Sequence, residues 1–201
     1  SALIWNLLDK FGQQALFFIV GVVLARMLDV ADFGLVVMLA IFTALSTIIS
    51  DSGFSYAIIR ERNITQIQCN TVFYFNISIS IVIYLILFFA APFIASFYNE
   101  PLLTILSRVY FLSILFNAAG SIQSALLMRN LQFNIFTKLN IAALICSSTV
   151  TLIFAFTGMG VLTLVCQTVR LSFFRTLFYW LNKNCLPTKA FQPQAIKSIF
   201  G

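Results

Sequence analysis

The sequence contains no histidine, few charged residues and no closely spaced cysteines, and each of these absences excludes a class of chemistry. Without histidine, imidazole zinc sites, haem ligation by histidine and Ser-His-Asp catalysis are not available to this sequence. The four cysteines show no CxxC spacing, so we interpret them as small apolar side chains. The phosphate-binding GxxxxGK(S/T) loop of ATP-driven pumps is also absent. We therefore expect no metal, no cofactor and no enzymatic activity.

Long apolar stretches fill nearly the whole chain. Hydrophobic residues make up 61% of the sequence and charged residues only 9%, whereas about a quarter of a soluble domain is charged. A helix of about 20 apolar residues matches a hydrocarbon core of about 30 Å. The stretches that reach this length are Ala2–Leu28, Gly34–Ile58, Ile67–Phe93, Leu102–Leu127, Phe133–Phe156 and Gly160–Leu181. The sequence therefore predicts an all-α integral membrane protein, a bundle of six transmembrane helices.

Basic residues alternate between the two sides of the predicted membrane. The second and fourth connections and the segment after the sixth stretch contain Arg60, Arg62, Arg129, Lys138, Lys183, Lys189 and Lys197. On the other side Arg26 stands alone, offset by Asp29 and Asp32. Because basic loops stay in the cytoplasm, we expect both ends of this chain to be cytoplasmic. The cations form no contiguous patch, so the net charge of +6 does not indicate a nucleic acid as partner.

The composition changes after the sixth stretch. Residues 1–181 form the predicted six-helix lobe, whereas residues 182–201 contain lysines and the two prolines Pro187 and Pro193, a pattern typical of a cytoplasmic linker. The chain begins with Ser1 and stops within this linker. We therefore expect a fragment, or one lobe of a larger transporter.

Four of the stretches carry a polar stripe along one helical face. The stripes on the first, second, fourth and sixth stretches include Asn6, Asp9, Lys10, Gln13, Ser46, Ser50, Asp51, Ser113, Asn117, Thr163, Gln167 and Arg170. A charge in hydrocarbon costs at least about 2.5 kcal/mol, so charges in these positions usually face a cavity or a partner. We expect these four helices to surround a polar space and the third helix to be more peripheral.

Cations outnumber carboxylates within the predicted spans, which favours an anionic ligand, above all a phosphate gripped by guanidinium. The residues expected to bind it are Arg170, Lys10, Arg175, Gln167, Asn117 and Gln13. Arg170 lies halfway along its stretch, and Lys10 lies at the same depth as Asp51, so these two can pair. Two other interpretations remain open. Asp9 and Lys10 are interfacial if the first helix starts at Phe11, and Arg175 is close enough to the cytoplasmic surface to be a topological anchor.

Several short motifs occur in a fixed order along almost the whole chain. They are Leu24-Ala-Arg-Met-Leu28, Asp32-Phe-Gly-Leu35, Ser50-Asp-Ser-Gly-Phe-Ser55, Thr71-Val-Phe-Tyr74, Ala91-Pro-Phe-Ile-Ala95, Gln123-Ser-Ala-Leu-Leu127 and Gly158-Met-Gly-Val161. In these motifs and their spacing the chain resembles the Wzx-like polysaccharide flippases of the MOP superfamily. One departure is Leu162, where relatives commonly have Trp.

The resemblance implies the N-terminal lobe of a transporter in which two lobes enclose a central cationic cavity. Such proteins move undecaprenyl-pyrophosphate-linked oligosaccharides across the bacterial inner membrane for the biosynthesis of lipopolysaccharide and other polysaccharides. The implied partners are the lipid-linked oligosaccharide, the bilayer and the missing C-terminal lobe of the same chain, and the full-length protein would be a monomer. Coupling would come from an ion gradient or the membrane potential, with Asp51 and Asp9 as the candidates for protonation or cation binding.

Two other functions stay open. A small-molecule or drug exporter of the same superfamily would share the fold, but acidic cavity residues would suit its cationic substrates. A membrane-embedded glycosyltransferase or polymerase would need acid and base groups around a sugar, and the available carboxylates Asp9, Asp51 and Glu100 lie at scattered depths.

Overall fold

The computed structural model describes residues 2–51 and 66–182, and this part of the chain is helical without a strand. Its helices are α1 (Ala2–Met27), α2 (Val30–Asp51), α4 (Gln66–Phe97), α5 (Leu103–Arg129), α6 (Phe133–Phe156) and α7 (Val161–Leu181). All six contain a segment long and apolar enough to cross a membrane. The predicted all-α bundle is confirmed, and the chain is a multi-pass membrane protein.

Most helix ends agree with the predicted stretches within a few residues. The clearest difference is α4, which continues past the predicted end at Phe93 to Phe97 with Pro92 inside it. A proline removes one helical hydrogen bond, but the residues that follow it gain contacts, since Ile94 and Ala95 are buried in the core. The predicted end of the second stretch at Ile58 lies outside the described residues.

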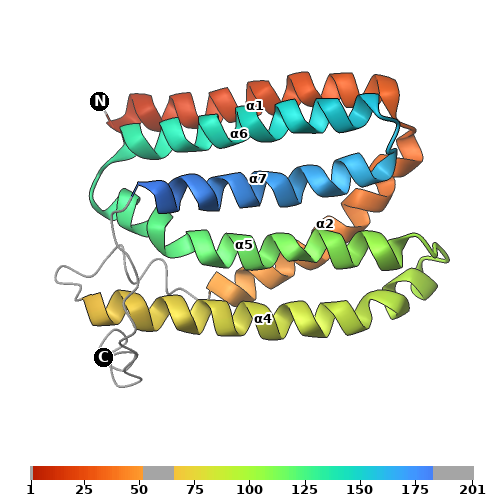
Figure 1. Ribbon diagram of the computed structural model, residues 1–201, viewed down its shortest axis with the longest axis horizontal. Helices are drawn as coiled ribbons and strands as arrows, with labels where there is room; N and C mark the ends of the chain where they lie inside the picture. The colour runs from red at the N-terminus through yellow and green to blue at the C-terminus, as the bar shows by residue number, and fades with distance from the viewer. Residues whose placement is uncertain (1, 52–65, 183–201) are drawn as a thin grey trace.

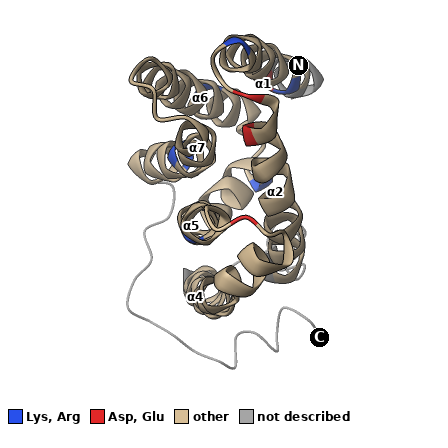
Figure 2. Cartoon of the chain, turned by 90° about the vertical axis from the view of Figure 1, so that its right-hand side faces the viewer, with Lys and Arg blue, Asp and Glu red and all other residues tan. Residues whose placement is uncertain are grey.

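Five helices lie side by side in a row, and one crosses them. Figure 1 shows α1, α6, α7, α5 and α4 in that order from top to bottom, with α2 running obliquely across the row. The main contacts agree with this order: α1 packs on α6, α6 on α7, α7 on α5, and α5 on α4. α2 covers one face of the row and contacts α4, α5 and α7 (Figure 2). The spatial order of the helices thus differs from their order along the chain.

The two ends of the bundle differ in charge. Arg129 and Lys138 lie at the turn between α5 and α6, at the end where α1 begins, which we name the basic end. Asp29, Asp32 and Glu100 lie at the opposite, acidic end. The described part of the chain therefore places these residues on alternate sides, as the sequence predicts.

The main core lies between α2, α4, α5 and α7. It contains Phe111 and Leu39, which are fully buried, and Val165 of α7. α4 lies at the edge of the row, and its buried Asn76 donates a hydrogen bond of 3.4 Å to Ser121 of α5. The third predicted helix is therefore peripheral, as expected, and its polar side chain faces a neighbouring helix.

A glycine allows α5 and α7 to approach closely. A Cβ atom at Gly120 would lie 2.8 Å from Thr176 Oγ1 and 3.5 Å from a ring carbon of Tyr179. Next to this point Thr176 donates a hydrogen bond of 2.6 Å to the Phe116 carbonyl, and the Trp180 indole donates one of 3.0 Å to the Ala119 carbonyl. Small residues of this kind let membrane helices pack through van der Waals contact and interhelical hydrogen bonds.

Candidate functional site

A cavity lies where α1, α2, α5 and α7 meet, the four helices on which the sequence shows polar stripes. Its volume is about 340 Å³, and it is open on one side. The lining consists of Phe17, Gly21, Leu24, Phe33, Val36, Asn117, Leu164, Gln167, Thr168, Leu171, Ser172 and Arg175. Three of the expected binding residues, Arg175, Gln167 and Asn117, are therefore brought together in one cavity.

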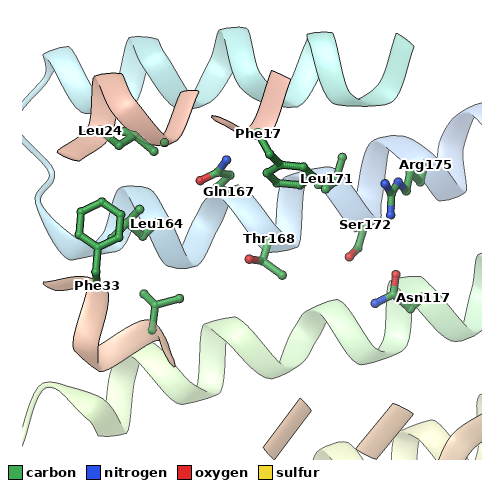
Figure 3. A pocket seen from close by; sticks show the side chains of 12 residues that line it. Phe17, Leu24, Phe33, Asn117, Leu164, Gln167, Thr168, Leu171, Ser172 and Arg175 are labelled. Atoms are coloured by element: carbon green, nitrogen blue, oxygen red, sulfur yellow. The ribbon is translucent and has the colours of Figure 1, made fainter. Parts of the chain in front are cut away.

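The cavity has an apolar end and a polar end. Figure 3 shows Leu24, Phe33 and Leu164 at one end and Asn117, Ser172 and Arg175 at the other. The lining residues of α7 follow helical spacing, with Leu164, Thr168, Leu171 and Arg175 three or four residues apart, so one face of α7 forms half of the lining. Arg175 lies toward the basic end of the bundle, because α7 ends there at Leu181.

The Arg175 guanidinium is only partly paired. One of its Nη atoms donates a hydrogen bond of 2.5 Å to Gln13 Oε1 of α1. Its buried Nε has no hydrogen-bond partner among the described residues. Because a guanidinium has five N–H donors, it can still bind an anion in the cavity while it contacts Gln13. Gln13 was expected to bind the ligand, and the structure places it behind Arg175, outside the cavity lining.

A second set of polar contacts lies one turn of α1 away from the hydrogen bond between Arg175 and Gln13. The carboxylate of Asp9, which is 8% exposed, accepts a hydrogen bond of 3.4 Å from Asn140 of α6. The Tyr179 hydroxyl of α7 donates a hydrogen bond of 2.5 Å to the other side of the same amide, Asn140 Oδ1. The Asp9 side chain is therefore buried between helices of the bundle.

Asn140 and Tyr179 were missed by the sequence analysis. A signal for Asn140 existed, because Thr137, Asn140, Ser147 and Thr151 form a buried polar stripe on α6. Tyr179 gave no such signal, since a tyrosine near the end of an apolar helix is typical of the membrane interface.

Arg170 lies on a different side of α7 from the cavity. Its guanidinium donates hydrogen bonds to Thr151 Oγ1 at 3.1 Å and the Thr163 carbonyl at 3.4 Å, and it stacks on the Phe154 ring at 4.6 Å. Arg175 lies five positions after Arg170, which corresponds to a rotation of about 140° around the helix, so these two arginines face different sides of α7. The structure therefore does not bring Arg170 together with the other expected binding residues.

Arg108 of α5 resembles Arg170 in its surroundings. Its guanidinium stacks on the Phe88 ring of α4 at 4.4 Å, and its buried Nε lacks a hydrogen-bond partner among the described residues, as does that of Arg170. Contact with an aromatic face stabilises a cation without neutralising it. Arg108 is absent from the cavity lining as well.

Two expected residues remain, Lys10 and Asp51. Lys10 is exposed on α1 and is not among the lining residues. α2 ends at Asp51, whose side chain lies outside the described residues, so the pairing of Asp51 with Lys10 stays a prediction. Among residues 2–51 and 66–182, no group of three or more His, Cys, Asp or Glu side chains could hold a metal ion.

The arrangement can bind an anion that also has an apolar or sugar portion. Arg175 supplies the charge, and Asn117, Gln167, Thr168 and Ser172 supply amides and hydroxyls around it. The described residues of the lining contain this one arginine and no carboxylate. Phe17 and Phe33 add aromatic surface to the lining.

Comparison with known proteins gives a family match over most of the chain. Residues 23–201 match the family described as Polysaccharide biosynthesis protein. The teichuronic acid biosynthesis protein TuaB of Bacillus subtilis is 28% identical over 161 residues, which cover 79% of this chain and 33% of that protein. The lipopolysaccharide biosynthesis protein WzxC of Escherichia coli is 28% identical over 133 residues, 66% of this chain and 27% of WzxC.

A third relative is named as a transport protein. The succinoglycan biosynthesis transport protein ExoT of Rhizobium meliloti is 24% identical over 163 residues, covering 81% of this chain and 33% of ExoT. The chain thus spans about a third of the length of the curated relatives it matches. No solved structure matches the chain at a significant level.

Proposed function

This chain belongs to the Polysaccharide biosynthesis protein family, and on that premise we propose that it forms part of a flippase. The flippase moves undecaprenyl-pyrophosphate-linked oligosaccharide across the bacterial cytoplasmic membrane for polysaccharide biosynthesis and export. The names of the relatives support this, since all three concern polysaccharide biosynthesis and ExoT is described as a transport protein. The protein acts as a transporter and not as an enzyme.

The observation that carries the proposal is the cation in the cavity. Arg175 has donors free for an anion, and the described lining residues include no carboxylate. A planar guanidinium binds phosphate oxygens through two parallel hydrogen bonds, which suits a pyrophosphate headgroup. The alternative, a drug exporter for cationic substrates, is not favoured by a cavity of this charge.

The expected binding residues take different parts in this proposal. Arg175, Gln167 and Asn117 contact the pyrophosphate or the first sugar, and Gln13 holds Arg175. Asp9 and Asp51 are the candidates for coupling transport to an ion gradient. Arg170 and Lys10 lie away from the cavity in this structure, so a contact with substrate requires a rearrangement of α1 or α7. The basic end faces the cytoplasm, and a further lobe of the full-length protein completes the transport pathway.

The test compares the two arginines of α7 in the full-length protein. Cells that depend on it for polysaccharide export are complemented with the Arg175→Ala or the Arg170→Ala variant, and surface polysaccharide is measured at matched levels of inserted protein. We expect Arg175→Ala to abolish export, Arg175→Lys to retain part of it, and Arg170→Ala to retain most of it. Full export by Arg175→Ala would refute the proposed binding site.

The orientation has its own test. After replacement of the native cysteines, a single cysteine at Ala31 or Asn99 is expected to react with a membrane-impermeant thiol reagent added outside the cell. A cysteine at Asn130 or Asn63 is expected to react only after the membrane is opened. Labelling of the Asn130 position from outside would reverse the orientation.

A further inference from the structure

Two opposite charges lie close together in the bundle, yet each contacts a neutral partner. The Arg175 guanidinium donates to Gln13, and the Asp9 carboxylate accepts from Asn140. Within a membrane an ion pair between neighbouring charges would ordinarily be favourable, because both charges are costly to leave in hydrocarbon. The neutral contacts therefore call for an explanation.

The two contacts form consecutive layers across α1, α6 and α7. Asp9 and Gln13 are four residues apart on α1, and Tyr179 and Arg175 are four residues apart on α7. Four residues correspond to about 6 Å along a helix, a distance that an arginine side chain can span. The Tyr179 hydroxyl lies within electrostatic reach of both Arg175 and Asp9. If the Arg175 side chain adopted a rotamer directed toward Tyr179, its guanidinium would reach the Asp9 carboxylate.

The amide between the two charges is held from several sides. Asn140 is 3% exposed. Its side-chain NH₂ group donates to Asp9, and its side-chain oxygen accepts from the Tyr179 hydroxyl. The Tyr179 ring stacks on Phe136 of α6 with 5.9 Å between centroids and 11° between planes. On its other side the ring fits against Gly120 of α5, where a Cβ would touch it. Tyr179 thus has little freedom, and it fixes the orientation of the amide.

We propose that Asn140 and Tyr179 are positioning residues that hold the Asp9 carboxylate away from Arg175 and so keep the guanidinium available to a phosphate or pyrophosphate group in the cavity. The carboxylate and the anion would use the same N–H donors, so Asp9 is an internal competitor of the ligand. Without the Tyr179 hydroxyl, the Asn140 amide loses its orientation and Asp9 turns to Arg175. The inference rests on the proposed anion site, and it identifies Asn140 and Tyr179 as residues that set the affinity of this site for its ligand.

The first experiment measures affinity for inorganic pyrophosphate in the full-length protein, reconstituted in nanodiscs, by isothermal titration calorimetry. Tyr179→Phe keeps the ring against Phe136 and removes only the hydroxyl. We expect it to weaken binding about tenfold, the factor that corresponds to one hydrogen bond to a charged group. The double variant Tyr179→Phe with Asp9→Asn is expected to restore binding, because the competing charge is gone. Asn140→Leu is expected to behave like Tyr179→Phe.

The second experiment needs no ligand. Phenylglyoxal modifies arginines, and peptide mass spectrometry reports the rate at each one. Arg175 is expected to react more slowly in the Tyr179→Phe variant than in the wild type, and at the wild-type rate again in the double variant. Arg170, on another side of α7 against α6, is the internal control and keeps its rate in all three proteins.

The outcomes separate the two proposals. If Tyr179→Phe changes neither the pyrophosphate affinity nor the labelling of Arg175, the positioning role is wrong. If the changes occur but Asp9→Asn does not reverse them, Tyr179 acts on packing or contacts the anion itself, and the inference is overturned. If the labelling follows the expected pattern while the wild type does not bind pyrophosphate, the positioning role stands and the proposed ligand is wrong.

Discussion

The two sides of the bundle differ in how tightly their helices are packed. In the most apolar part of α5, 56% of the residues are buried inside the bundle, whereas the corresponding share is 11% in both α1 and α2. We name α5 and α7, where this share is 56% and 28%, the packed wall, and α1 and α2 the open side. The packed wall contains Phe111, Leu103 and Leu106, each at most 2% exposed, whereas Phe18, Ile41 and Ile48 of the open side are all more than half exposed.

The cavity lies between these two regions, with α7 on one side and α1 and α2 on the other. A transporter must keep its fold while helices around the substrate separate. The difference in packing suits the proposed transport role, because the packed wall holds α7 and its Arg175 in place and the open side leaves room for a ligand. Three pairs of substitutions test the comparison. Each pair changes one residue of the packed wall and one of the open side.

The largest effect is expected for a buried aromatic residue. Phe111→Ala removes a fully buried ring from the packed wall and leaves a hole that the neighbouring helices cannot fill. We expect the free energy of unfolding to fall by about 3–5 kcal/mol, measured by SDS titration of the purified protein. Phe17→Ala, at a ring that is 38% exposed and lines the cavity, is expected to cost less than a third of that. Equal losses would show that the two regions are packed alike.

A smaller effect is expected for a pair of glycines. Gly120→Ala places a methyl group 2.8 Å from Thr176 Oγ1 and forces α5 and α7 apart. The same titration is expected to show a loss of about 1–3 kcal/mol. Gly21→Ala, on α1, meets no atom within 4 Å and gains helix propensity, so its stability is expected to stay equal or rise by up to about 1 kcal/mol. A destabilised Gly21→Ala variant would contradict the open packing of α1.

The smallest effect is expected for single hydrogen bonds. Trp180→Phe keeps an aromatic ring beside Phe73 and removes the indole bond to the Ala119 carbonyl. Its expected cost is about 0.5–1.5 kcal/mol, because one partly buried interhelical hydrogen bond is lost. Thr47→Ala on α2 removes a hydroxyl that bonds only within its own helix, to the Ala44 carbonyl, and is expected to change little. A larger loss for Thr47→Ala than for Trp180→Phe would reverse the comparison.

The polar stripes identified the four helices that surround the cavity, and Asn117 and Gln167 of these stripes line it. Arg175 also lines the cavity, although it does not belong to the predicted stripe of its helix. Helical periodicity places such residues on one face, and a polar face in a membrane turns inward. Position along the helix favoured Arg170 as a binding residue, whereas in the structure Arg170 is turned toward α6 and contacts Thr151.

Contacts between helices could not be read from the chain. The layer of Asp9, Asn140 and Tyr179 joins α1, α6 and α7, and α1 is separated from α6 by more than a hundred residues of sequence. No periodicity within one helix indicates which other helix lies beside it. Short connections predict neighbours in sequence, but here α5 packs on α7 and α1 packs on α6.

The sequence by itself determined the solvent, the secondary structure and the charge of the two ends, since six apolar stretches can satisfy their backbone hydrogen bonds in a bilayer only as helices. Only the tertiary structure decided which of two arginines on α7 faces the cavity and which neutral side chains stand between Arg175 and Asp9. The physical reason is that the hydrophobicity of each helix decides whether the helix enters the membrane, whichever other helix it packs against. The choice of partner depends on side-chain shape at close approach, such as the space that Gly120 leaves for Thr176 and Tyr179.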